Sequence, residues 1–365
     1  MKKILLFGAS GSIGKSTLEV IRKHPDKFLL CGAHCHSDKD FLDKIKNEFN
    51  ITTTALSYCE DNSIYQKLID NAKPDIVVNG IATSAGLFAS YTTLKNGIDL
   101  ALANKESLVM AGSLLKKEAK KSGAHILPVD SEHWGLFSLL QDKKIETIKS
   151  LWLTASGGPF LNRPLHEFKS ITPIEATNHP TWKMGKKISI DSATMANKGL
   201  ELIEAVELFN MDESKIKVTI QPTSHVHALM QTIDGSFYAQ ISNPTMQLPI
   251  LNALSYPDII NSDIGGLDLS ELTLVFKQPE PQRYPLLALA REAVKIGAWG
   301  KVAYNAANEA AVDFFIQNKI KFTQIANVVE NVLSKQGEVD AEIDGIISTH
   351  KEIYNQACNY CKGLS

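Results

Sequence analysis

Asp130 and Glu132 are two acidic residues that stand two positions apart, directly after the apolar run 126–129. In an extended backbone residues i and i+2 point to the same side, so we expect both side chains to project together from the end of a buried strand. Two carboxylates held this close repel each other unless they share a proton or bind a cation. Oxygen donors suit a hard divalent ion, so the pair predicts a site for Mg²⁺ or Mn²⁺.

A second group of polar residues lies in segment 188–201, which leads into an amphipathic helix. Asn197 and Glu201 are four positions apart and Lys198 and Glu201 are three apart, so all three are expected on one helical face. Ser192 precedes them, at a position where hydroxyls and backbone amides bind anions. The segment therefore predicts an anion site one helical turn from a third carboxylate. The alternative is that Glu201 is a solvent-exposed charge, as most helical glutamates are.

The glycine-rich segment 8–14 reads Gly-Ala-Ser-Gly-Ser-Ile-Gly and joins the first expected strand to the first expected helix. Small residues there let the backbone approach a phosphate, whose charge a helix N-terminus stabilises. The spacing departs from the GxGxxG of dinucleotide-binding folds. Residues 14–16 read Gly-Lys-Ser, so the segment also resembles a P-loop, in which Asp130 would hold the Mg²⁺ of a nucleoside triphosphatase. That alternative gives Glu132 no role, and a glycine turn without a ligand is a third interpretation.

The end of the second expected strand bears on the choice between NAD and NADP. Folds that bind NAD usually place an acidic residue there, where it accepts a hydrogen bond from the ribose 2′-hydroxyl. Here His36 and Ser37 follow the strand and, with Lys39, could accept a 2′-phosphate. Asp38 is the nearest acidic residue and lies past the strand end. The segment favours NADP.

Short apolar runs alternate with helical stretches through the first part of the chain. Strands are expected at 4–7, 28–33, 75–79, 98–102 and 126–129, and helices at 13–23, 41–49, 64–71, 108–121 and 134–140. Apolar runs too short for helices that alternate with helical segments are typical of a parallel sheet covered on both faces. We therefore predict an α/β fold whose N-terminal domain is Rossmann-like.

The pattern changes after about residue 145. Strands are expected at 147–154, 215–221 and 237–241, with helices and long loops between them, which predicts an α+β catalytic and connective domain. A proline-rich passage is predicted to be a linker, and the remaining sequence has helical periodicity without strand signals. The predicted boundaries are 1–145, 146–277, 278–285 for the linker, and 286–365 for a C-terminal helical domain.

The composition of the 365-residue chain is that of a globular protein, with 44% hydrophobic and 21% charged residues. A net charge of −2 argues against a nucleic-acid or membrane partner. The N-terminal apolar run is too short for a signal peptide, and the cysteine count of five is odd, so we expect reduced thiols and a cytoplasmic location. A zinc site built from the Cys and His residues of 31–36, or from Cys358 and Cys361, is a minor alternative.

Taken together, these segments resemble the 1-deoxy-D-xylulose 5-phosphate reductoisomerase family of the non-mevalonate isoprenoid pathway. The resemblance covers essentially the whole chain, and segment 188–201 is its most specific part. Segment 128–133, Pro-Val-Asp-Ser-Glu-His, is a second matching motif. The other matching segments are 8–14, 102–107, 155–160, 179–185 and 305–309.

The resemblance implies roles for individual residues. The metal-binding carboxylates are Asp130, Glu132 and Glu201. The substrate contacts are Lys105, Ser131, Ser156, His179, Ser192, Asn197 and Lys198, the last three near the substrate phosphate. The cofactor contacts are Ser10, Gly11, Ser12, Ile13, Asn104, Glu106 and Gly185. His36 and Ser37 stand where many members have small, basic or amide residues at the 2′-phosphate of NADPH.

The resemblance also implies the reaction, which rearranges the carbon skeleton of 1-deoxy-D-xylulose 5-phosphate and reduces the resulting aldehyde with NADPH. The product is 2-C-methyl-D-erythritol 4-phosphate, and Mg²⁺ or Mn²⁺ serves as the Lewis acid. In a retro-aldol route two fragments must be held until they rejoin, which requires an anchored phosphate and a closing loop. That loop is expected at 156–185, with Trp182 and Met184 over the substrate and a hinge at 157–158. A homodimer is implied as well.

Overall fold

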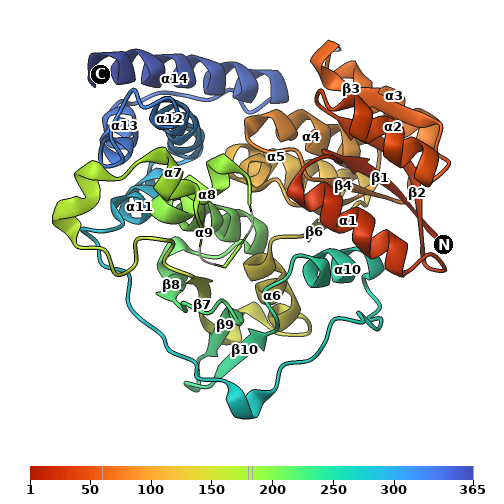
Figure 1. The fold of residues 1–365 in the computed structure, drawn as a ribbon, viewed down its shortest axis with the longest axis horizontal. Helices are drawn as coiled ribbons and strands as arrows, with labels where there is room; N and C mark the ends of the chain where they lie inside the picture. Colours follow the sequence, from red (N-terminus) through yellow and green to blue (C-terminus); the bar gives the residue numbers. More distant parts are fainter. Residues whose placement is uncertain (60, 180, 183, 365) are drawn as a thin grey trace. The chain divides into compact units, whose positions relative to one another are not determined.

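The computed structural model describes residues 1–59, 61–179, 181–182 and 184–364 (Figure 1). The contacts within the chain group it into two compact units. The first unit comprises Met1–Ser107, Ser113–Trp134 and Thr245–Gly265, and the second comprises Leu108–Gly112, Gly135–Pro244 and Gly266–Ser365. Among the described residues, no helix combines the length and the apolar character that a membrane span requires.

The first unit is built on a six-stranded sheet with the order β3-β2-β1-β4-β5-β6. All its neighbouring strands run parallel, which confirms the predicted Rossmann-like fold. The residues Ile4–Phe7 and Ile76–Val78 of the two central strands are fully buried, so both faces of the sheet are covered. The strands are β1 (Lys2–Phe7), β2 (Phe28–Cys35), β3 (Thr53–Leu56), β4 (Ile76–Asn79), β5 (Asp99–Leu102) and β6 (Ile126–Pro128).

The helices of the first unit connect these strands. Helix α10, although it comes late in the sequence, contacts α1 and the strands β5 and β6. Helix α6 begins in the first unit and ends in the second. The helices are α1 (Ser12–Lys23), α2 (Lys39–Glu48), α3 (Ser63–Ala72), α4 (Leu87–Lys95), α5 (Lys105–Ser122), α6 (Ser131–Leu140) and α10 (Gln247–Ser255).

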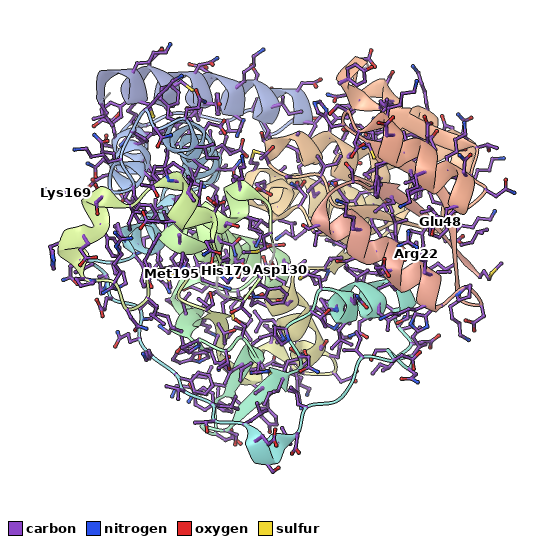
Figure 2. All side chains as sticks on the ribbon, in the orientation of Figure 1. Arg22, Glu48, Asp130, Lys169, His179 and Met195 are labelled. Atoms are coloured by element: carbon purple, nitrogen blue, oxygen red, sulfur yellow. The ribbon has the colours of Figure 1, made fainter. Side chains whose placement is uncertain are left out.

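Two elements of this unit, β3 and α4, were not predicted from the sequence. Strand β3 reads Thr-Thr-Ala-Leu and has no alternating apolar pattern. Helix α4 buries small polar residues such as Ser90 and Thr93, so it lacks the polar face that marks an amphipathic helix. Strand β2 also runs two residues past its expected end, to Cys35. An ion pair between Arg22 of α1 and Glu48 of α2 joins neighbouring helices (Figure 2).

The second unit contains a four-stranded mixed sheet with the order β10-β9-β7-β8. Strands β7 and β8 are parallel and the other pairs are antiparallel. One face of the sheet packs on a core that includes Leu136 of α6 and Leu202 of α9. Strand β9 was not predicted. The strands are β7 (Ile148–Ala155), β8 (Ile216–Ile220), β9 (Val226–Thr232) and β10 (Phe237–Ile241).

Helices make up the rest of the second unit. The sequence after residue 286 is helical as predicted, and α12 packs against α11, α13 and α14. The proline-rich passage before α11 is anchored by a hydrogen bond, because the hydroxyl of the buried Tyr284 donates to the Gly157 carbonyl at 2.8 Å. The domain boundaries proposed from the sequence stay predictions. The helices are α7 (Pro173–Thr177), α8 (Lys186–Thr194), α9 (Ala196–Phe209), α11 (Pro285–Ile296), α12 (Ala298–Ile316), α13 (Gln324–Leu333) and α14 (Ile343–Leu364).

Helix α9 is fixed in place by a glycine. A Cβ atom at Gly199 would lie 2.3 Å from the Tyr304 hydroxyl and 2.9 Å from the Ala290 Cβ atom. Tyr304 is fully buried and cannot move aside cheaply. The absence of a side chain at Gly199 therefore lets α9 pack closely against α11 and α12. Gly199 stands between Lys198 and Glu201 in the sequence.

Candidate active site

Asp130 lies in the turn between β6, which ends at Pro128, and α6, which begins at Ser131 (Figure 2). Its Oδ1 atom accepts hydrogen bonds from the backbone N–H groups of Glu132 and His133, at 3.1 and 3.5 Å, as a helix-capping residue does. Glu132 belongs to the first turn of α6. The expectation that both carboxylates project from one extended strand is therefore wrong, because the chain turns into a helix directly after Asp130.

Asp130 has two buried side chains as partners. The Lys105 Nζ atom lies 2.8 Å from Oδ2, and the His133 Nδ1 atom lies 3.3 Å from Oδ1. Lys105 is only 5% exposed, so its ammonium is separated from bulk water, and the Asp130 carboxylate supplies a counter-charge to it. His133 was not singled out from the sequence, although it ends the matching motif 128–133. The Ser131 hydroxyl donates to the Glu132 carboxylate at 2.5 Å.

The second cluster lies on α9 and is buried. Lys198 and Glu201 are 3% and 1% exposed, and they form a short ion pair. The Asn197 amide donates to the other carboxylate oxygen of Glu201. The predicted shared face is confirmed, and the alternative of a solvent-exposed Glu201 is wrong. Ser192 lies one helix earlier, in α8, because Met195 adopts a left-handed conformation and separates the two helices (Figure 2).

Helix α8 is linked to the helical part of the unit through a buried aspartate. Asp191 accepts a hydrogen bond from Asn308 of α12 at 2.9 Å, and its other oxygen lies 2.7 Å from the Lys187 ammonium. Asn305, one turn earlier on α12, donates to Glu309 at 3.0 Å. The matching segment 305–309 of α12 thus holds α8 in place through Asn308, and so helps fix the start of α9.

Ser156 and His179 lie at the two ends of the loop predicted to close, and the structure brings them together. The His179 Nδ1 atom accepts hydrogen bonds from the Thr181 and Trp182 amides, so the ring proton resides on Nε2, which donates to the Ser156 hydroxyl at 3.1 Å. Burial lowers the pKa of His179 to about 4. Gly157, with a φ of 86°, suits the hinge predicted at 157–158, although its motion stays a prediction. Within the matching segment 179–185, residues 180 and 183 lie outside the described part.

The glycine segment forms the tight turn expected between β1 and α1. Gly8 has a φ of 79°, and a Cβ atom at Gly14 would lie 2.3 Å from the Ala9 carbonyl oxygen. Gly11 precedes the first turn of α1. The Lys15 ammonium lies 5.5 Å from the centre of the Phe41 ring, so this side chain is directed at α2. That direction does not fit the phosphate-binding lysine of a P-loop.

The segment after β2 is held in a defined geometry. The His36 Nδ1 atom lies 3.1 Å from the Ser57 hydroxyl, and the His36 carbonyl accepts a hydrogen bond from the Tyr58 amide at 3.1 Å. The Asp38 carboxylate accepts a hydrogen bond from the Phe41 amide and caps α2. Ser57 was missed from the sequence because nothing in its own neighbourhood marks it.

Asn104 and Glu106 join the ends of β4 and β5. The Asn104 side chain donates to the Ile81 and Thr83 carbonyls, at 2.9 and 2.7 Å, and to the Glu106 carboxylate at 3.0 Å. Its oxygen accepts from the Ser107 amide and caps α5. Both predicted cofactor residues therefore also hold the strand ends together. Gly185, a third predicted cofactor residue, is the N-cap residue of α8, and among the described residues no atom would lie within 4 Å of a Cβ atom added to it.

The described cysteines act as plain thiols. Cys31, Cys35, Cys358 and Cys361 form no disulfide, and burial raises the pKa of Cys31 and of Cys361 to about 11. The His34 ring is buried against Phe7 and Tyr65. Among the described residues of 31–36 and 358–361, no three ligand atoms come close enough to hold a metal ion. The zinc alternative is therefore without support.

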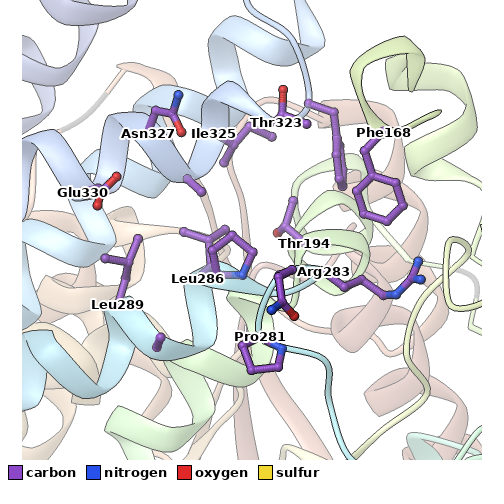
Figure 3. Close-up of a pocket in the computed structure, with 15 residues that line it drawn as sticks. Phe168, Thr194, Pro281, Arg283, Leu286, Leu289, Thr323, Ile325, Asn327 and Glu330 are labelled. Carbon is purple, nitrogen blue, oxygen red and sulfur yellow. The ribbon is translucent and has the colours of Figure 1, made fainter. Parts of the chain in front are cut away.

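A pocket of about 400 Å³ lies in the second unit between α11 and α13 (Figure 3). Its apolar lining residues include Phe168, Leu286 and Ile325, and its polar ones include Arg283, Asn327 and Glu330. None of the described residues that line it is a predicted site residue. Of the described lining residues, Thr194 at the end of α8 is the nearest in sequence to α9.

Three family models match the chain. The model described as 1-deoxy-D-xylulose 5-phosphate reductoisomerase matches residues 4–64 and 35–112. A model of the C-terminal domain of that enzyme matches residues 126–209, and a second, described as the DXP reductoisomerase C-terminal domain, matches residues 241–356.

Curated proteins and solved structures are similar over nearly the full length. The 1-deoxy-D-xylulose 5-phosphate reductoisomerase of Treponema denticola is 45% identical and the matched region covers 97% of this chain and 94% of that one. The enzyme of Thermodesulfovibrio yellowstonii is 42% identical, with coverage of 91% and 92%. A DOX-P reductoisomerase in complex with NADPH, fosmidomycin and magnesium has a TM-score of 0.92 and 38% identity, and covers 100% and 99% of the two chains. The Zymomonas mobilis enzyme in complex with NADPH has a TM-score of 0.88, 34% identity and full coverage of both chains.

The partial burial of the His179 ring generates a prediction about pH. This neutral histidine has a folded-state pKa of about 4, whereas an unfolded histidine has one of about 6.5. The contribution of the neutral ring to stability is therefore complete above pH ~6.5 and is lost as the pH falls toward 4. We expect an NMR titration of the ring to give a value near 4, with His179→Gln identifying the signal. A midpoint near 6.5 would show that the ring is not buried as described.

Proposed function

Because the chain belongs to the 1-deoxy-D-xylulose 5-phosphate reductoisomerase family, we propose that it converts 1-deoxy-D-xylulose 5-phosphate into 2-C-methyl-D-erythritol 4-phosphate, using NADPH and a divalent metal ion. The proposal is carried by the buried ion pair of Lys198 and Glu201 on α9 and by the partly buried Asn197 beside it. A cation, an amide and a carboxylate thus lie side by side. An enzyme that binds a phosphate next to a metal ion needs this combination.

The proposed metal ligands are Asp130, Glu132 and Glu201. All three supply carboxylate oxygens, the donors that Mg²⁺ and Mn²⁺ prefer. The backbone N–H groups that bind Asp130 hold its Oδ1 atom in place, which pre-organises one ligand. When bound, the ion supplies Lewis acidity toward the hydroxyl and carbonyl oxygens of the substrate.

The proposed substrate contacts divide between the phosphate and the reacting carbons. Lys198, Asn197 and Ser192 bind the phosphate, for which a buried ammonium and an amide are strong donors. The remaining contacts belong to the hydroxyketone part and to the closing loop. They are Lys105, Ser131, Ser156 and His179. Because the pKa of His179 in the folded protein is about 4, the ring is neutral at neutral pH, and its Nε2–H group can donate a hydrogen bond without adding charge to the site.

The loop 156–185 has a clear task in this reaction. Both fragments of a broken carbon skeleton must stay in place until they rejoin, and water must be kept from them. The contact between Ser156 and His179 draws the two ends of the loop together, and Gly157 between them gives the backbone freedom to swing.

NADPH is proposed to bind at the carboxyl ends of the first unit's strands and to supply the hydride. Small residues at the start of α1, namely Ser10, Gly11, Ser12 and Ile13, admit the pyrophosphate. His36 and Ser37 bind the 2′-phosphate, and Asn104, Glu106 and Gly185 make further contacts. The Asp38 carboxylate is engaged in capping α2, so it does not compete with the 2′-phosphate for these donors.

A homodimer is proposed on the basis of the exposed sheet edge in the second unit. Phe237, Tyr238 and Ile241 of the edge strand β10 are 53%, 43% and 37% exposed. Leu269 and Phe276, in the irregular stretch before α11, are exposed as well. An exposed apolar edge of this kind is a common interface between copies. A cytoplasmic location is proposed because the described thiols are free.

The activity is tested by mixing the protein with NADPH, Mg²⁺ and 1-deoxy-D-xylulose 5-phosphate and following the absorbance of NADPH. We expect loss of absorbance that EDTA abolishes. Glu201→Gln keeps the shape of the side chain but removes a ligand charge, so turnover should fall at least about a hundredfold while NADPH still binds. Glu292→Gln, an exposed change on α11, should match the unmodified protein. Metal-independent turnover, or full activity of Glu201→Gln, would rule out the assigned role.

The cofactor assignment is tested by fluorescence titration with NADPH and NADH. His36→Leu should weaken NADPH binding about ten- to hundredfold, because a hydrogen bond to the charged 2′-phosphate is lost, and should leave NADH binding unchanged. Ser57→Ala should cause a smaller loss in the same direction, since the ring is no longer held. An equal loss for both cofactors would mean that His36 supports the fold and does not read the 2′-phosphate.

A further inference from the structure

Two of the carboxylates proposed as metal ligands are each bound by a buried lysine. Lys105 binds Asp130 in the first unit, and Lys198 binds Glu201 in the second. We propose that these lysines are internal counter-cations that exchange partners when ligands bind, so that the substrate's phosphate and the divalent ion bind cooperatively. This inference rests on the proposed function, because it takes its metal ligands and phosphate contacts as the starting point.

Helix α9 shows why an exchange is favoured. One oxygen of Glu201 accepts from the Lys198 ammonium and the other accepts from the Asn197 amide. The side chains are three and four residues apart on one helical face, so they remain neighbours whichever partner they hold. Each carboxylate oxygen keeps a second lone pair, so a divalent ion can bind beside these donors, but its two positive charges then repel the Lys198 ammonium and favour its move away from Glu201.

The displaced lysine loses an ion-pair partner. Lys198 is almost fully buried, and weakening an ion pair in a buried position is unfavourable unless another anion takes its place. A phosphate monoester supplies that counter-charge and has three oxygens to accept from both the ammonium and the Asn197 amide. With the ion on Glu201 and the phosphate on Lys198, one ion pair is replaced by two and each buried charge keeps a partner.

Asp130 is arranged in the same way. Its Oδ1 atom is held by the backbone, while its Oδ2 atom is the one that Lys105 occupies at 2.8 Å. An ion that binds Oδ2 displaces the Lys105 ammonium and leaves the capping bonds intact. The released lysine then becomes available to an oxygen of the substrate, which is the role proposed for it above.

Cooperativity follows by linkage. Phosphate binding draws Lys198 away and strengthens metal binding, so metal binding must strengthen phosphate binding by the same factor. A matched control lies two turns further along α9, where the buried Glu207 pairs with Lys301 of α12. That pair has the same chemistry, but neither residue is a proposed ligand.

The experiment measures Mn²⁺ affinity of the full chain from the electron paramagnetic resonance signal of free Mn²⁺. The phosphate probe is ethyl phosphate, which has no hydroxyketone oxygens to chelate the ion. Saturating ethyl phosphate should lower the Kd for Mn²⁺ at least about fivefold. Lys198→Met should bind Mn²⁺ more tightly than the unmodified protein without phosphate and should show no further gain with it. Lys301→Met should retain the full coupling.

Two controls accompany this experiment. Lys198→Arg preserves the charge and should restore the coupling. If Lys198→Met does not fold, the coupling is tested instead by the effect of Mn²⁺ on the ethyl phosphate affinity of the unmodified protein, which should rise by the same factor. No coupling in a catalytically active protein, or coupling that survives Lys198→Met, overturns the inference alone. A protein without metal-dependent turnover instead overturns the proposed function.

Discussion

Every buried carboxylate needs a positive or hydrogen-bonding partner, and this constraint shapes the region around α9. The helix carries Glu201 and Glu207 on buried faces; Glu201 is bound by the buried Lys198 and Glu207 by the partly buried Lys301. In α8 the buried Asp191 is bound by Lys187 and Asn308 in the same manner. Because removing one partner from such a pair leaves an uncompensated charge, the pairs fix helix positions more strictly than apolar packing alone would.

The backbone features of the site serve the same constraint. The left-handed Met195 separates α8 from α9, so that Asp191 and Glu201 can each face their own partners. Gly199 lets α9 approach α12, which carries Lys301. In the first unit, the turn after β6 gives the Asp130 carboxylate two backbone donors on one oxygen and leaves the other to Lys105. In both units, a carboxylate proposed as a metal ligand forms an ion pair with a buried lysine.

Much of this architecture could be predicted from local sequence pattern. Apolar runs located five of the six strands of the first unit, whereas β3 and α4 have no periodic pattern to detect. The geometry at Asp130 could not be predicted, because a capping aspartate and a strand-end aspartate look alike in sequence. Partners such as Ser57 for His36 are far apart in the chain and are set by the fold. The individual site residues came from family motifs, since spacing alone could not distinguish Glu201 from an exposed glutamate.

Asp130, Glu132 and Glu201 are proposed to hold one divalent ion, and Lys198 is proposed to leave Glu201 when the ion and a phosphate bind. Anomalous diffraction from crystals grown with Mn²⁺ and ethyl phosphate tests both proposals most directly. We predict one Mn²⁺ peak within bonding distance of the three carboxylates, with the Lys198 ammonium on the phosphate. A Mn²⁺ peak bound elsewhere, or an ion on Glu201 with Lys198 still paired to it, would contradict the account.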